Sequence, residues 1–98
     1  MAELPPITVR ELIGLVRRDD GSAMVEVLLS EPPDRAWAHE FERRADDPPA
    51  GLLGAVHLER RLQAVRFVIE PPVDKPRQRS ALEWLHDVVA ATNDAFDA

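Results

Sequence analysis

The stretch Ala23-Met-Val-Glu-Val-Leu-Leu29 decides how this chain folds. Its apolar residues recur at every second position and are rich in valine, which is typical of a β-strand with one buried face. A similar pattern recurs forty residues later, in Val65-Arg-Phe-Val-Ile69. We therefore predict a strand in each stretch, and in the first we expect Val25, Val27 and Leu29 to face the core.

The forty-residue offset continues outside these two strands. Leu12-Ile-Gly-Leu-Val16 aligns with Leu52-Leu-Gly-Ala-Val56. The residues that follow each predicted strand align in the same frame, Pro32 with Pro72 and Asp34 with Asp74. Each half thus contains strand, turn, strand, proline-marked corner and helix. This indicates an internal ββα repeat, residues 12–45 and 52–96, although the identities are few and shared architecture or chance remains an alternative.

The segment before the first turn is ambiguous. Val9, Leu12, Ile13 and Val16 have the spacing of one helix face, and Thr8 with Glu11 matches a capping box. A hairpin turn follows at residues 19–22, however, and the repeat pairs this segment with a strand. We expect a strand, which gives the element order ββαββα. The alternative, with residues 9–18 helical, gives αβαββα.

Two helices are predicted. The first begins near Pro33 or Asp34 and ends near Ala45, because proline and aspartate suit a helix start. The second is indicated by a capping box in Ser80-Ala-Leu-Glu83. Its apolar stripe consists of Leu82, Leu85, Val89, Thr92 and Phe96.

These elements predict an α+β fold in which both helices cover one face of a four-stranded, mainly antiparallel sheet. At 98 residues the chain has the length of a single domain, 1–98, and residues 1–6 read as a flexible arm. A second hairpin is expected from residues 53–59 and 63–70, turning at Arg60 and Arg61.

The amino-acid composition argues against several classes of function. The net charge is −6, which disfavours binding to nucleic acid or to anionic lipid. Cysteine is absent, so disulfides and thiolate chemistry are excluded. No apolar run is long enough to span a membrane, and we expect a cytoplasmic protein. Eleven of the twelve cations are arginine, a bias typical of GC-rich bacterial coding sequence.

No motif for catalysis or for a cofactor stands out. His39-Glu40 begins like a zinc-protease helix motif, but Arg43 occupies the position of the second histidine. A G-x-S-x-G nucleophile elbow and a phosphate-binding glycine loop are both missing. We expect no catalytic residues, no metal site and no cofactor, and an enzyme is the less favoured class.

One cluster of basic residues suggests a binding site for an anionic ligand. Lys75, Arg77 and Arg79 lie close together near the start of the last predicted helix. Cations beside free helix N–H groups can hold a phosphate or a carboxylate. The competing interpretation is that these side chains are solvated or pair with acids such as Asp74 and Glu83.

The reverse face of the predicted sheet is too apolar for a fully solvated surface. It should carry Met24, Glu26, Leu28, Arg66 and Val68, and Trp84 on the last helix is a further candidate anchor for a partner. We therefore favour a noncatalytic binding or regulatory module that acts through a protein–protein interface, with a partner protein or with itself as a dimer. The alternative is a small anionic-ligand domain or small enzyme that uses the corner of Lys75, Arg77 and Arg79.

Overall fold

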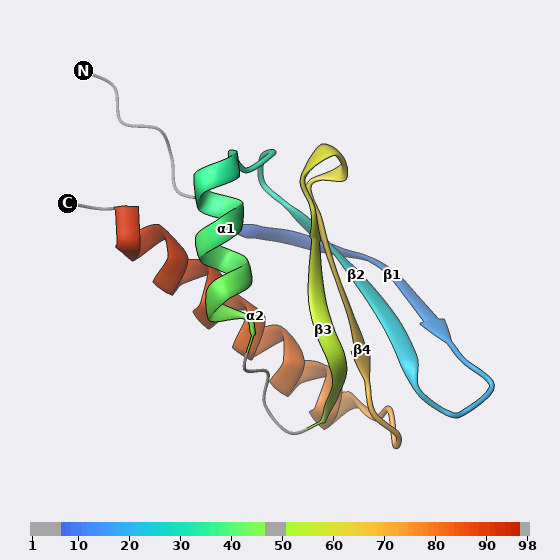
Figure 1. The fold of residues 1–98 in the computed structure, drawn as a ribbon. Coiled ribbons are helices and arrows are strands. Elements are labelled where there is room, and N and C mark those ends of the chain that lie inside the picture. Colours follow the sequence, from blue (N-terminus) through green and yellow to red (C-terminus); the bar gives the residue numbers. More distant parts are fainter. Residues whose placement is uncertain (1–6, 47–50, 97–98) are drawn as a thin grey trace.

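A computed structural model of the chain describes residues 7–46 and 51–96. Its elements follow the order ββαββα (Figure 1). They are β1 (Val9–Arg17), β2 (Ala23–Leu29), α1 (Arg35–Arg44), β3 (Leu52–Glu59), the short 3₁₀ helix η1 (Arg60–Leu62), β4 (Ala64–Ile69) and α2 (Lys75–Phe96). The predicted α+β fold is confirmed, and the helical alternative for residues 9–18 is wrong because β1 occupies that segment. The predicted arm, residues 1–6, lies outside the described residues.

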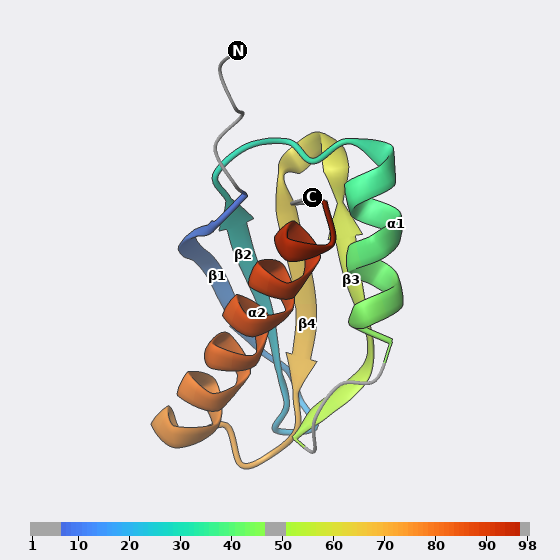
Figure 2. The same cartoon turned by 90° about the vertical axis from the view of Figure 1, so that its left-hand side faces the viewer.

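The four strands form one antiparallel sheet in the order β1-β2-β4-β3. The two hairpins meet in the middle, where β2 pairs with β4, so β1 and β3 are the outer strands. Both helices lie on one face of the sheet (Figure 1). In the second view α1 lies over β3, and α2 crosses the sheet diagonally toward the side of β1 (Figure 2).

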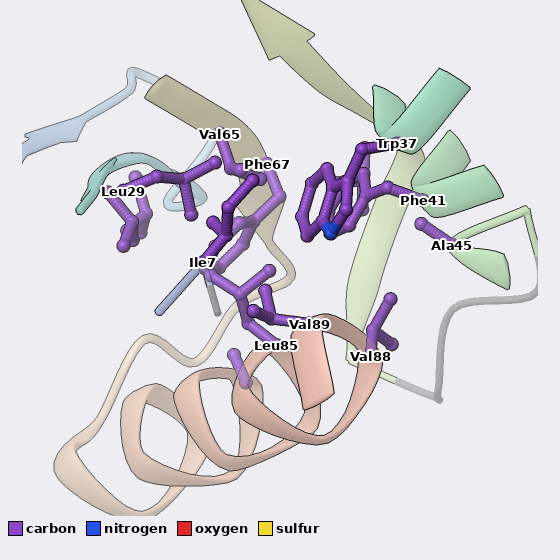
Figure 3. Packing of buried hydrophobic residues seen from close by; sticks show 14 of the residues in the cluster. Ile7, Leu29, Trp37, Phe41, Ala45, Val65, Phe67, Leu85, Val88 and Val89 are labelled. Atoms are coloured by element: carbon purple, nitrogen blue, oxygen red, sulfur yellow. The ribbon is translucent and has the colours of Figure 1, made fainter. Parts of the chain in front are cut away.

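The core lies between the sheet and the two helices. Alternate residues of the central strands fill it, among them Val27 and Phe67, which are almost fully buried. From the helices, Phe41 and Leu85 are completely buried. The ring of Trp37 stacks on Phe41 with centroids 5.4 Å apart, and these side chains lie beside Phe67 and Val89 (Figure 3). The predicted core role of Val25, Val27 and Leu29 is confirmed, since all three are buried.

The helix-like spacing in β1 has a structural cause. The pairing of β1 with β2 shifts register twice, between Val9 and Glu11 and between Leu12 and Gly14. Each shift adds one residue to β1, as a β-bulge does. As a result Val9, Leu12 and Leu15 stand opposite the core residues of β2 although they are three positions apart. Apolar residues three positions apart can therefore lie on the same face of this strand.

The start of α2 differs from the prediction. The helix begins at Lys75, about one and a half turns before the expected start at Ser80. Asp74 is the residue that caps it, because its Oδ1 accepts a hydrogen bond of 2.9 Å from the N–H of Arg77. Asp34 caps α1 in the same way, with 2.8 Å to the N–H of Trp37. Aspartate at this position satisfies a backbone donor that has no partner inside the helix.

A side-chain bridge joins both helices to the segment before β1. Trp37 Nε1 donates to Asn93 Oδ1 at 2.9 Å, and Asn93 Nδ2 donates to the carbonyl oxygen of Ile7 at 2.7 Å. One amide thus satisfies a donor on α1 and an acceptor next to β1. Both of these groups would lose their partner without it.

We expect Asn93→Ala to lower the free energy of unfolding by about 1–3 kcal/mol, because a partly buried indole N–H and a carbonyl lose their partners. Urea denaturation followed by tryptophan fluorescence measures the change. Asp94→Ala, at the exposed neighbouring position, is the control and should shift stability by less than about 0.5 kcal/mol. Equal effects of the two substitutions would contradict the bridging role.

Candidate interaction surface

The five predicted interface residues of the sheet lie together on the face opposite the helices. Pairing of β2 with β4 sets Met24 opposite Val68 and Glu26 opposite Arg66, with Leu28 next along β2. Their neighbours on both strands point the other way, into the core. No helix of the described residues covers this open face (Figure 1).

The open face is mixed in character. Glu26 and Arg66 form an ion pair across its centre, in which the guanidinium Nε donates to a carboxylate oxygen. Leu28 and Val68 are half-buried, and Met24 is exposed. The charged pair thus separates apolar side chains along the two central strands, and the face is neither a sealed core nor a fully polar surface.

Trp84 does not join these residues. It lies on α2, where it is half-buried and packs against the core cluster. Because α2 covers the other side of the sheet, Trp84 and Met24 are on opposite layers of the molecule (Figure 1). A single flat partner cannot contact both through the open face.

Four exposed apolar residues lie on the first hairpin, and sequence reasoning identified only Met24 among them. Leu12 and Ile13 are each 45% exposed, Val16 is 57% exposed, and Met24 is 39% exposed. All four belong to the hairpin of β1 and β2, and Val16 stands directly opposite Met24. The other large exposed apolar residues of the described chain are Leu62 and Phe96. The apolar residues of β1 have helix-like spacing, and from this spacing the side chains that face solvent could not be identified.

The turn that closes this hairpin is held by its own side chains. The Asp20 carboxylate accepts hydrogen bonds from the hydroxyl and the backbone N–H of Ser22. These bonds favour the charged form and keep the pKa of Asp20 below its ordinary value. The backbone N–H of Arg18 also donates to the carbonyl oxygen of Ser22, at 2.8 Å. The hairpin therefore presents its apolar residues from a fixed turn.

A shallow apolar hollow lies between β1 and α2. It is lined by residues of both outer elements and of the central strands: Leu12, Leu15, Val25, Phe67, Ile69, Gln78 and Leu82. Its volume of ≈ 10 Å³ is far below the roughly 300–1,000 Å³ of typical small-molecule pockets. The hollow has room for about one water molecule and is too small for a cofactor.

The three predicted ligand-binding cations are divided. Arg77 donates to the carbonyl oxygen of Glu70 at 3.3 Å, and its Nη1 lies 3.9 Å from the Glu70 carboxylate. Lys75 and Arg79 are exposed and lie one turn apart on another side of α2. The N–H of Arg77 is already occupied by Asp74. The structure thus brings Lys75 and Arg79 together and turns Arg77 away from them.

The histidines of the described residues do not form a site. His39, His57 and His86 lie on α1, β3 and α2, and all three are exposed. Within residues 7–46 and 51–96 there is no group of three side chains suited to hold a metal ion. None of the helices described is long and apolar enough to cross a membrane.

The strength of the ion pair between Glu26 and Arg66 tests whether the open face is exposed to solvent. A double-mutant cycle of Glu26→Ala and Arg66→Ala should give a coupling energy of about 0.5–1 kcal/mol, the range of partly solvated pairs. The coupling should shrink in about 1 M salt, because salt screens exposed charges. Chemical denaturation of the four proteins measures it. A coupling above about 2 kcal/mol would mean that the pair is covered in solution, and a value of zero would mean that the pair adds no net stability.

We found no match to this chain among protein-family models, curated proteins or solved structures. No residue role can therefore be transferred from a relative. The exposed hairpin of β1 and β2, the open face beside it and the hollow under α2 are the features from which a function can be argued.

Proposed function

We propose that this chain is a noncatalytic binding module that acts through a protein–protein interface on the hairpin of β1 and β2. The observation that carries the proposal is the pair of exposed apolar side chains Val16 and Met24, which lie opposite each other on the open face of that hairpin. Leu12 is also exposed, but it stands opposite Val27 and therefore lies on the helix side. Scattered apolar residues need no explanation, but a contiguous group of them marks a contact surface.

The geometry of the hairpin supports this proposal. Val16 and Met24 are directly opposite each other on adjacent strands, so their side chains form one continuous patch. Val68 stands opposite Met24 on the next strand and extends the patch onto the open face. A partner seated there would cover apolar area that α1 and α2 leave in solvent.

Two further features favour binding over catalysis. The buried polar side chains of the described residues are Ser22 and Thr92, and each has a structural partner within its own turn or helix. The apolar hollow is also too small for a cofactor. We place this module in the cytoplasm as part of the same proposal, on the basis of its cysteine-free, acidic composition.

The partner is either a different protein or a second copy of this chain. A second copy would form a dimer by placing two open faces or two hairpins against each other. Light scattering over a range of concentrations separates these cases, because only self-association changes the mass of the purified chain.

The proposal is tested by replacing the apolar side chains of Val16 and Met24 with charged ones. We expect the double variant Val16→Asp, Met24→Asp to weaken partner capture or dimerisation at least tenfold, since acidic groups would have to be desolvated in the contact. Both positions are exposed, so the fold should tolerate the change. Leu62→Asp is the matched control, because Leu62 is equally exposed but belongs to η1 at the other hairpin.

Retention of binding by Leu62→Asp together with its loss in the double variant would support the proposal. A wild-type chain that stays monomeric and cross-links to no protein through a photoreactive group at position 16 would contradict it. Equal binding by the wild type and the double variant would contradict it as well.

A further inference from the structure

The first turns of α2 are only partly supported by the sheet. In the second view this part of the helix extends past β1, beyond the outer edge of the sheet (Figure 2). Gln78 and Leu82 of this helix, with Leu12 and Leu15 of β1, border the shallow apolar hollow. Leu82 is only half-buried and Leu12 is exposed, so both leave apolar surface uncovered at this place.

The backbone of β1 is available beside the hollow. β1 is an outer strand, and in the described residues no strand pairs with its outer side. The two register shifts disturb its first half, but Gly14–Arg17 pairs regularly with residues 23–26 of β2, from Gly14 opposite Glu26 to Arg17 opposite Ala23. An outer strand presents unpaired N–H and C=O groups that an added strand can use. A fifth strand paired with this part of β1 would lie beside the hollow, on the side toward which α2 extends.

Three cations belong to the two elements that border the hollow. Lys75 and Arg79 are exposed and lie on the side of α2 that carries Gln78 and Leu82. Arg17 stands opposite the buried Ala23, so it is on the helix-covered side of β1. Acids flank these cations in the sequence, Asp74 and Glu83 on α2 and Asp19 after Arg18, but among the described residues none of the three cations forms an ion pair. Such a site attracts an acidic ligand and repels a basic one.

We propose that β1 and the first turns of α2 form a docking site for an extended, acidic segment of a partner protein, which adds a fifth strand to the sheet at Gly14–Arg17. Its apolar side chains cover Leu12 and Leu82 at the surface, and its carboxylates contact Lys75 and Arg79. This inference rests on the proposed function, because it names the kind of partner that the hairpin binds.

The experiment selects from a display library of random twelve-residue peptides on the whole chain. We expect enriched peptides that alternate apolar residues with aspartate or glutamate. Chemical shifts of amides in Gly14–Arg17 and around Leu82 should change on titration with the best of them. Lys75→Glu with Arg79→Glu should weaken that peptide at least tenfold, and acids near a helix N-terminus do not harm the helix. The matched control is Arg35→Glu with His39→Glu, at the corresponding positions of α1, and it should bind like the wild type.

Other outcomes would overturn the inference. Enrichment of neutral or basic peptides, or equal binding by the Lys75→Glu, Arg79→Glu variant, would remove the role of the cations. Peptides that shift Met24 and Val68 instead of β1 would place binding on the open face, so that the proposed function survives and this inference fails. A β1-mediated dimer would assign the edge to a second copy. A further outcome is that the library yields no binding peptide while the double variant Val16→Asp, Met24→Asp still loses partner capture. That result would overturn this inference and support the proposed function.

Discussion

Antiparallel pairing of β2 with β4 holds the two halves of the chain together. The register sets Val25 opposite Phe67 and Val27 opposite Val65 on the side of the helices, where all four are buried. On the other side the same register sets Glu26 opposite Arg66 as an ion pair. Each remaining element is attached to these two strands, either as the outer strand of a hairpin or as a helix packed on their buried face.

Because there are two helices for four strands, coverage of the sheet is uneven. α1 lies over β3, and α2 crosses diagonally, so the start of α2 lies away from the sheet while its later part packs on the core (Figure 2). The outer strand β1 receives the least cover, which explains why Leu12 is exposed on the helix side, whereas Val16 is exposed because it lies on the open face. In this account the binding surface is the part of the sheet that the chain itself leaves uncovered.

Much of the fold could be predicted from the sequence where one local pattern dominates. Alternation predicted β2 and β4, and Asp34 with the residues after it predicted α1. The start of α2 was missed because two capping signals, Asp74 and Ser80, lie in one stretch, and only packing decides that the helix begins at Lys75. In β1 the two register shifts give an outer strand the spacing of a helix, so its exposed residues could not be identified.

The candidate site was predicted in part. Met24, Glu26, Leu28, Arg66 and Val68 do share the open face, because alternation along paired strands determines the face. The position of Trp84 on the opposite layer depends on how α2 packs, which periodicity does not show. The sheet order β1-β2-β4-β3, with Asp34 and Asp74 capping the two helices alike, is the arrangement that two copies of a ββα unit would produce. The duplication itself stays a prediction.

Amide hydrogen exchange of the purified chain, measured residue by residue by NMR, tests most directly whether the edge of β1 is open. The account predicts the slowest exchange in β2 and β4, and an alternation of slow and fast amides along Gly14–Arg17, since one set of N–H groups bonds to β2 and the other faces solvent. Uniformly slow exchange along that segment would show that the edge is already paired, and uniformly fast exchange would show that β1 is not held in the sheet. Either result would contradict the account.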